Sequence, residues 1–228
     1  MNKSNLKRTI VGIMALISLL ALKSQADTNV TYSIAVNALI PDGNPVGIVS
    51  STNLSGLDMG ITSVQVALNV TGGFNGDLYA YLLGPSGGFA VLLNRVGLTA
   101  ANPFGYGDTG FNITLADGYA NVRNYQSGSY TITGGQLMGN WAPDGRNIDP
   151  QSSGTIFDGA TSTAGLDLFN TTNPNGQWTL FVGDLAGGGG SSTLVSWGLT
   201  IAIPEPQEWA LLAGGAGMLV AFRRRKVS

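Results

Sequence analysis

Acidic side chains at predicted turns are the residues of this chain best suited to chemistry. Eight aspartates of its central part lie mostly at turns or strand ends: Asp77, Asp108, Asp117, Asp144, Asp149, Asp158, Asp167 and Asp184. Ca²⁺ takes about six to eight oxygen ligands from carboxylates, carbonyls and water, so aspartates gathered in loops can bind it. Asp is also a good turn former, and no segment has the spacing of an EF-hand loop. Ca²⁺ binding and simple turn formation therefore both stay open.

Two missing residue types exclude much other chemistry. The chain contains no His and no Cys, which excludes Ser-His-Asp and Cys-His hydrolysis, imidazole and thiolate metal sites, and disulfides. A pair of carboxylates can still hydrolyse a glycoside, but no spacing here marks one carboxyl as the acid and another as the base. We therefore expect a protein that is not an enzyme, with a hydrolase as the least favoured alternative.

Three tryptophans suggest two different roles. Trp178 and Trp197 alternate with aliphatic residues on predicted strands, which is typical of core packing. Trp141 lies in a Gly-Asn-Trp-Ala-Pro sequence at residues 139–143, which predicts a loop. Trp141 is therefore the candidate for an exposed ligand contact, with an extracellular glycan as the ligand.

Short alternating runs predict the elements that must position these side chains. The predicted strands span residues 31–39, 61–70, 77–83, 88–93, 111–115, 129–133, 177–183 and 194–203. Residues 116–169 are expected to form surface loops with room for one more strand. Because no part of residues 27–208 shows a convincing helical period, we predict an all-β domain, a jelly-roll-like β-sandwich.

Three sequence patterns follow one another in the predicted sandwich. They are Asp77-Leu78-x-x-x-Leu82-x-Gly84-Pro85-x-Gly87, Asn175-Gly176-x-Trp178-x-Leu180-x-Val182-x-Asp184 and Leu194-x-x-Trp197-x-Leu199-x-Ile201. Their order resembles the proprotein convertase P domain, a jelly-roll β-sandwich that usually follows a subtilisin-like protease. The resemblance covers residues 61–203 and leaves residues 27–60 as an N-terminal strand and lead-in segment.

The P-domain resemblance also has implications for the site. Bacterial relatives of this module can hold Ca²⁺, and Asp77 and Asp184 match the family pattern. The resemblance therefore implies these two aspartates as the Ca²⁺ ligands. The family's usual role of stabilising an attached protease has no partner domain in this sequence.

The charges of the chain are segregated. All 13 acidic residues lie between Asp27 and Glu208, where the cations are Arg95, Arg123 and Arg146, so this span carries 3 − 13 = −10. The other eight cations lie near the two ends of the chain. An acidic body does not provide the basic footprint that nucleic acid requires, so we expect no nucleic-acid partner.

The first 26 residues have the pattern of a secretory signal peptide. Three cations, Lys3, Lys7 and Arg8, precede an apolar run at residues 10–22, and the small residues Ser24 and Ala26 occupy the −3 and −1 positions of a cleavage site. Residues 1–26 are therefore predicted to be a signal peptide cut after Ala26, with an uncleaved anchor as the alternative.

The last 25 residues combine a short apolar run with terminal cations. The run at residues 209–222 would span about 21 Å as a helix, which is short of the roughly 30 Å hydrocarbon core of a bilayer. Arg223, Arg224 and Arg225 would stop transfer and stay on the cytoplasmic side. This segment therefore predicts a short transmembrane helix that holds the chain in the membrane only temporarily.

The order of parts in this segment, residues 204–228, resembles the PEP-CTERM sorting signal of Gram-negative bacteria. The matching residues are Pro204, Glu205 and Pro206, the apolar run, and the arginine cluster at residues 223–225. The resemblance implies an exosortase as partner, tail removal near the Pro-Glu-Pro motif, and export to the cell surface or extracellular matrix. An ordinary single-pass anchor is the alternative.

Together these features predict an exported, non-enzymatic protein with a structural or adhesive role. Its expected setting is the cell surface or the extracellular polysaccharide or biofilm matrix. The alternative is a binding module for a glycan or Ca²⁺, and Ca²⁺ is the one cofactor that the sequence allows us to consider.

Overall fold

The computed structural model describes residues 27–204, and residues 1–26 and 205–228 lie outside the described part. The predicted signal peptide, the apolar run at 209–222, Glu205, Pro206 and the arginines at 223–225 all lie outside it. Residues Asn29–Ile203 form one compact unit. Of the second unit, Met1–Thr28 with Pro204–Ser228, the structure describes only residues 27, 28 and 204. A protein of residues 27–204 contains every strand of the described fold and its complete core.

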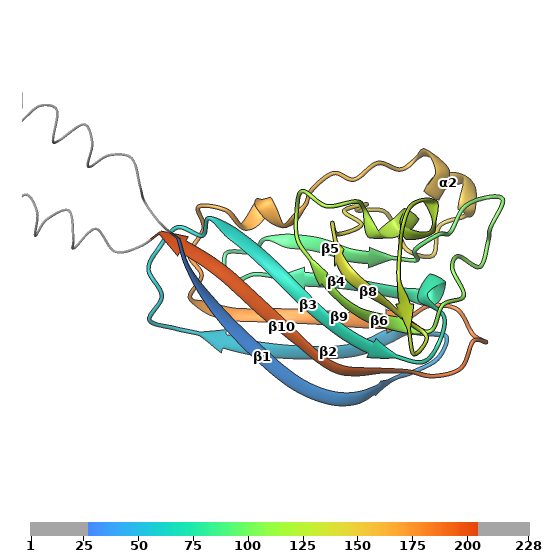
Figure 1. Ribbon diagram of the computed structural model, residues 1–228, viewed down its shortest axis with the longest axis horizontal. Coiled ribbons are helices and arrows are strands. Elements are labelled where there is room, and N and C mark those ends of the chain that lie inside the picture. Colours follow the sequence, from blue (N-terminus) through green and yellow to red (C-terminus); the bar gives the residue numbers. More distant parts are fainter. Residues whose placement is uncertain (1–26, 205–228) are drawn as a thin grey trace, which may run out of the picture. The chain divides into compact units, whose positions relative to one another are not determined.

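Two β-sheets face each other and form a β-sandwich (Figure 1). The larger sheet has the order β1-β10-β3-β6-β8-β7, and the smaller sheet has the order β2-β9-β4-β5. The predicted sandwich is thereby confirmed. The strands are β1 (Asp27–Ile40), β2 (Asn44–Leu54), β3 (Ser63–Thr71), β4 (Leu78–Leu83), β5 (Phe89–Asn94), β6 (Gly110–Leu115), β7 (Ile132–Thr133), β8 (Gln136–Trp141), β9 (Gly176–Asp184) and β10 (Ser192–Pro204).

Alternating apolar side chains explain why these strands form a sandwich. In β3 every second residue from Val64 to Val70 is buried and the residues between them are mostly exposed, because successive side chains point to opposite faces of a sheet. β4 buries Leu78, Ala80 and Leu82 against the same core. The two sheets therefore bury one row of side chains from each strand between them.

The alternation in β10 differs from the prediction at one end. Its pairing with β3 shifts between Leu194 and Ser196, which marks a β-bulge. The bulge turns Leu194 into the core and leaves Val195 half-exposed, although strict alternation through Val195, Trp197, Leu199 and Ile201 predicts that Val195 shares the face of the other three. From Trp197 onward the predicted face is buried as expected.

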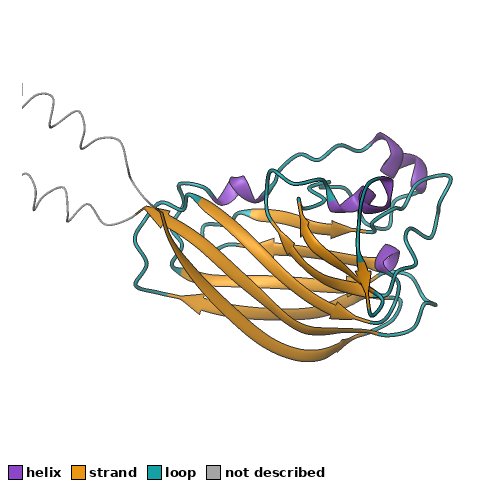
Figure 2. Ribbon diagram, in the orientation of Figure 1, coloured by secondary structure: helices purple, strands orange, loops and turns teal. Residues whose placement is uncertain are grey.

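The helices are short, and all of them except η1 lie with the long loops on one side of the sandwich (Figure 2). This side carries β5 and β8, whereas β1 and β2 lie at the opposite margin (Figure 1). The helices are the 3-10 helices η1 (Asn75–Asp77), η2 (Val122–Ser127) and η3 (Leu166–Phe169) and the α-helix α2 (Gly154–Gly159).

The predicted boundary at residue 60, between a lead-in segment and the sandwich, is wrong. β1 lies beside β10 in the larger sheet, and β2 pairs with β9 over residues 44–54 in the smaller one. Residues 27–60 therefore supply one strand to each sheet and are part of the sandwich. Neither β2 nor β8 was among the predicted strands, although a further strand was allowed for within residues 116–169.

A hydrogen bond between the sheets involves Trp197. Its indole N–H donates to Ser50 Oγ of β2 at 2.9 Å, and its ring is almost fully buried. We predict that Trp197→Phe, which removes this bond, costs about 1 kcal/mol of unfolding free energy. Trp197→Ala should cost about 3–5 kcal/mol, because it also leaves a cavity.

Denaturant unfolding of a protein of residues 27–204 measures both effects. Val49→Ala is the control, because the Val49 side chain is 64% exposed and its truncation should stay within about 0.5 kcal/mol. A Trp197→Ala variant as stable as the Val49→Ala variant would contradict the role of Trp197 in the core.

Candidate functional site

The structure brings Asp77 and Asp184 together at one end of the smaller sheet. Asp77 ends η1, and Asp184 ends β9, where it pairs with Leu78 at the start of β4. Both residues are buried, with 5% and 0% exposure. A further link joins the two segments, because the backbone N–H of Leu185 donates to the carbonyl of Asp77 at 2.9 Å.

The Asp184 carboxylate has few hydrogen-bond partners for a buried charge. Its Oδ1 accepts only two long bonds, from the backbone N–H of Ala186 at 3.4 Å and of Gly43 at 3.5 Å. Its Oδ2 is buried without a hydrogen-bond partner. Burial raises the pKa of Asp184 despite these two bonds. A buried carboxylate in this condition requires a proton or a cation.

Asp77 shares the site with a cation of the chain. The Arg95 guanidinium Nη2 lies 3.8 Å from Asp77 Oδ1, and its Nε donates to the carbonyl of Gly76 at 3.1 Å. The backbone of Arg95 has the left-handed φ of 50°, which is uncommon for a residue with a side chain. Strained backbone of this kind often marks functional sites.

Burial and the charge of the Asp184 carboxylate are the two main causes that raise the pKa of Asp77. Burial raises the pKa of Asp77 to about 6, the charge of Asp184 adds to this, and Arg95 opposes it. Asp42 of the neighbouring loop also raises this pKa. Three carboxylates therefore influence one another at this end of the sandwich, with a single guanidinium among them.

The Asp77–Asp184 pair offers a cation two carboxylates. Among residues 27–204, no group of three or more acidic side chains lies in an arrangement that could hold a metal ion. A Ca²⁺ ion here would therefore need carbonyl and water oxygens for most of its shell. The unpartnered Asp184 Oδ2 is the feature that fits such an ion.

Other aspartates are engaged in holding the loops. Asp144 and Arg146 form a buried bidentate pair, with Nε–Oδ1 at 2.7 Å and Nη2–Oδ2 at 2.8 Å. Asp117 accepts hydrogen bonds from the backbone N–H groups of Leu166 and Asp167 at the start of η3. These carboxylates fulfil the turn-forming role that the sequence left open.

The prediction that Trp141 is exposed is wrong. Trp141 ends β8, and its side chain is only 7% exposed. Its indole N–H donates to the carbonyl of Met138 at 3.0 Å, and its ring meets the Tyr125 ring edge-on. The ring is therefore part of the core and does not offer an open face to a sugar.

An aromatic row that the sequence analysis missed lies on the outer face of the smaller sheet. Phe181 of β9 stacks on Tyr81 of β4 with ring centroids 4.8 Å apart. The ring centroid of Phe89 lies 4.9 Å from that of Tyr81, and the ring centroid of Tyr79 lies 6.2 Å from that of Phe181. Tyr79 and Tyr81 alternate with the buried residues of β4, which is the signal that could have revealed the row.

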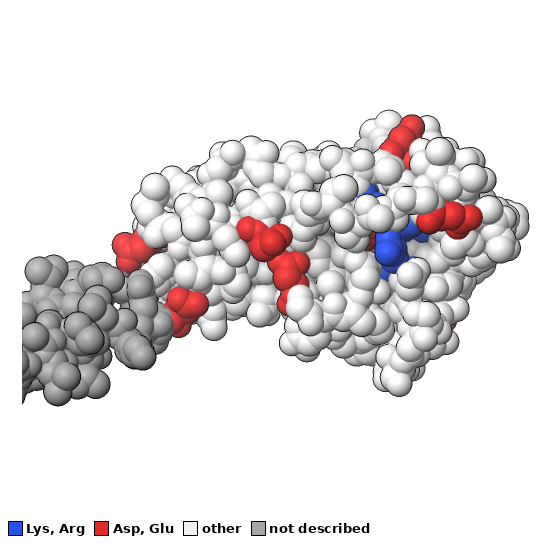
Figure 3. Space-filling view, turned by 90° about the horizontal axis from the view of Figure 1, so that it is seen from above, with Lys and Arg blue, Asp and Glu red and all other residues white. Residues whose placement is uncertain are grey.

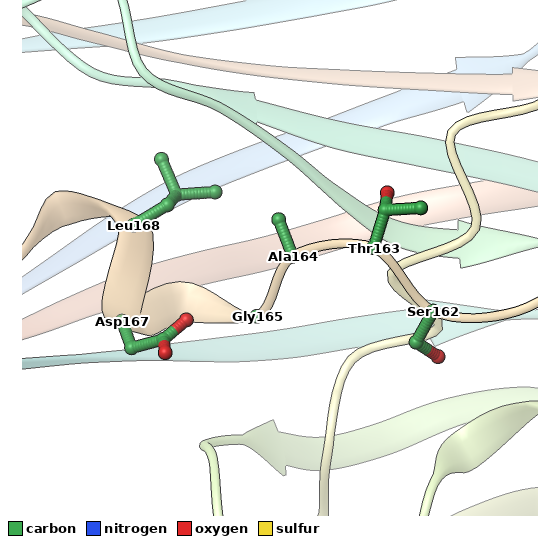
Figure 4. A pocket seen from close by; sticks show the side chains of 6 residues that line it. All are labelled: Ser162, Thr163, Ala164, Gly165, Asp167 and Leu168. Carbon is green, nitrogen blue, oxygen red and sulfur yellow. The ribbon is translucent and has the colours of Figure 1, made fainter.

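A hollow in the loop at residues 162–168 is not a convergent polar site. An open hollow of about 420 Å³ is lined by residues of one segment, 162–168. Figure 4 shows that Asp167 and Ser162 point in one direction, and that Leu168 and Thr163 point in the opposite direction.

Figure 3 shows acidic groups scattered over one face of the molecule, with the basic atoms of this face gathered in one place. Within residues 27–204, none of the helices is both long and apolar enough to cross a membrane.

Comparison with known proteins gives a likeness of fold. No protein-family model matches the sequence, and no curated protein matches it. The crystal structure of the Aeromonas sobria serine protease in complex with its chaperone is similar to 83% of this chain, at 15% identity and a TM-score of 0.47. The crystal structure of the serine protease of Aeromonas sobria is similar to 81% of it, at 16% identity and a TM-score of 0.44. The chain spans 29% of the length of each protein, and such a likeness carries no activity over to it.

The raised pKa of Asp77 predicts a pH dependence of stability in metal-free protein. A carboxyl with a raised folded-state pKa contributes stability that is complete below its unfolded pKa of 3.8 and is lost as pH rises through about 6. Asp77→Asn cannot ionise, so it should gain stability relative to wild type as pH rises through this window. The gain is about 1.4 kcal/mol for each pH unit that separates the two pKa values.

Thermal melting of residues 27–204 in a chelator at about pH 4.5 and pH 7.5 measures this difference. Asp149→Asn is the matched control, because Asp149 Oδ1 only accepts a local backbone hydrogen bond from Gln151. A difference between Asp77→Asn and wild type that does not change with pH would contradict the account of this site.

Proposed function

We propose that this chain is an exported structural or adhesive protein that an exosortase sorts to the cell surface of a Gram-negative bacterium. Its place would be the surface itself or the extracellular polysaccharide or biofilm matrix. The observation that carries the proposal is the order of the Pro-Glu-Pro motif at residues 204–206, the apolar run at 209–222 and the arginines at 223–225. The signal-peptide pattern of residues 1–26 supplies the matching route of export.

The position of the sorting motif relative to the described strands is in keeping with this proposal. β10 spans Ser192–Pro204, so the described sandwich reaches the first residue of the sorting motif. A protease that cuts after this motif would therefore leave all the described strands intact. Pro204 and Pro206 favour an extended backbone, the conformation that a protease cleft accepts.

The body is proposed to be a P-domain-like jelly roll. Four strands of the larger sheet in the order β1-β10-β3-β6 face β2-β9-β4-β5, which is the arrangement of an eight-stranded jelly roll. A non-enzymatic role is in keeping with carboxylates such as Asp144 and Asp117, whose hydrogen bonds hold the loops.

Substitution of the sorting motif tests the main proposal in the native host. Glu205→Ala or Pro206→Ala should prevent tail removal and leave the unprocessed chain in the membrane fraction. Gln207→Ala is the matched control, because it lies beside the motif but outside it. Immunoblotting of membrane and extracellular fractions gives the readout, and unchanged processing of Glu205→Ala would exclude the proposed sorting.

A second candidate function is Ca²⁺ binding at Asp77 and Asp184. It is favoured by the unpartnered, buried Oδ2 of Asp184 and by the mutual repulsion of the two carboxylates. A divalent cation would neutralise both and bind with help from nearby carbonyls and water. The bound cation would then link η1, which carries Asp77, to the end of β9, which carries Asp184.

Melting of residues 27–204 with and without Ca²⁺ at about pH 7.5 tests this site. At roughly 100 times its dissociation constant, a ligand specific for the native state adds about 2.7 kcal/mol, or about 5–10 °C for a domain of this size. Asp184→Asn should abolish the shift, and Asp149→Asn should keep it. No shift at millimolar Ca²⁺ would leave a shared proton as the partner of Asp184.

A further inference from the structure

The margins of the two sheets are protected unequally. On the loop-covered side, the outer edge of β5 is closed by the backbone of the loop at residues 144–145. The N–H groups of Asp144 and Gly145 donate to the carbonyls of Leu92 and Val91 at 3.0 Å each. The buried Asp144–Arg146 pair holds this loop in place. β7, the strand at the same margin of the larger sheet, has only two residues.

The opposite margin is built from two long strands. β1 and β2 are the last strands of their sheets and have 14 and 11 residues. Among the described residues, no element lies beyond them in either sheet (Figure 1). Such long sheet edges invite pairing with another strand, and proteins usually block them with charges, prolines or short strands.

β1 lacks the usual protection along its regular part. Residues 28–40 include no charged side chain and no proline. The left-handed backbone of Asn37, with φ of 51°, interrupts the strand only near its end. β2 is less suitable for pairing, because it contains Pro45 and its pairing with β9 shifts between Asn44 and Ile48. Residues 29–36 of β1 are therefore the open edge.

The core side of β1 also remains incompletely covered. Val30, Tyr32, Ile34 and Val36 pack against the hydrophobic core but are only partly buried. In β3, two strands further in, every core-facing side chain is buried. An additional strand beside β1 would cover this apolar row and satisfy the outer row of backbone N–H and C=O groups.

The distribution of charge over the described residues favours a second copy of this chain as the partner for the β1 edge. The described residues carry 11 acids and 3 cations, so two copies of this body repel each other over most of their surfaces. The uncharged edge of β1 is a surface on which two copies can meet without burying a carboxylate. A charged peptide would gain no opposite charge at this edge.

We propose that β1 pairs antiparallel with β1 of a second copy of this chain and so forms a symmetric dimer with one continuous larger sheet. In the register centred on Ser33, Tyr32 lies opposite Ile34 and Val30 opposite Val36 of the second copy. Aromatic and β-branched side chains form favourable cross-strand pairs of this kind. The contact is self-complementary, as a two-fold interface requires, and it needs neither the sorting segment nor Ca²⁺.

Because the natural chain has no Cys, single cysteines give a direct test. Directly opposed residues of antiparallel strands have Cα atoms about 4.5–5.5 Å apart, within the range of about 4.4–6.8 Å for a disulfide. We expect Ser33→Cys to form a covalent dimer of residues 27–204 on mild oxidation. Thr31→Cys or Ala35→Cys would react instead if the two-fold axis lies at one of those residues.

Gln65→Cys is the matched control, because Gln65 is exposed on β3 of the same sheet, two strands away from the edge. The proposal would be overturned if Gln65→Cys cross-links as fast as the β1 variants. It would also be overturned if none of the β1 variants cross-links. Sedimentation equilibrium of the wild-type body should show a dimer. A monomer at about 1 mM, or assemblies larger than a dimer, would also overturn it.

Charge reversal provides an independent second test. When the charge is placed at the residue that cross-links, which is Ser33 in the register above, the Lys and the Glu variant (here Ser33→Lys and Ser33→Glu) should each be monomeric, because like charges would face each other across the two-fold axis. An equimolar mixture of the two should recover the dimer. Circular dichroism checks that both variants are folded, and a mixture that stays monomeric would contradict pairing at β1.

Discussion

The burial of one row of apolar side chains from each sheet is the constraint on which the rest of this structure depends. With no cysteine in the chain, no disulfide can hold the two sheets together. Trp178 and Trp197, both fully buried, lie in the core from opposite sheets. The strand positions, and through them the loops, follow from this single packed layer.

Charged groups have been kept away from this layer except where the fold gives them a defined partner. The Asp144–Arg146 pair is buried and bidentate, and Arg146 also lies over the Phe157 ring at 4.8 Å. The Asp77–Asp184 pair differs, because its one nearby guanidinium is 3.8 Å away and one carboxylate oxygen has no hydrogen-bond partner. This contrast singles out the second pair as the candidate site: its position costs stability unless a proton or cation is bound.

The sequence pattern predicted the inner strands well and the outer ones less well. β3, β4 and β10 bury alternate residues, so their period-two pattern is visible in the sequence. β2 lies at a sheet edge, carries Pro45 and buries only Leu54 fully, so it has little hydrophobic alternation to detect. The bulge near Leu194 shifts the pattern by one residue, which no fixed period can anticipate.

The candidate site depended even more on contacts between distant residues. Asp77 and Asp184 were expected together through a family resemblance, but their burial and the left-handed backbone of Arg95 follow only from the folded chain. Trp141 was misplaced because its neighbours Gly139, Asn140 and Pro143 read as a loop. Its burial depends on Tyr125 of η2, which local sequence does not reveal.

The molecule thus combines a self-contained sandwich with two end segments whose sequences are typical of export and sorting. Intact-mass spectrometry of the protein collected from the cell surface or the medium tests this account most directly. The account predicts a mass that begins at Asp27 and ends near the Pro-Glu-Pro motif. A mature protein that still carries Arg223, Arg224 and Arg225 would contradict it.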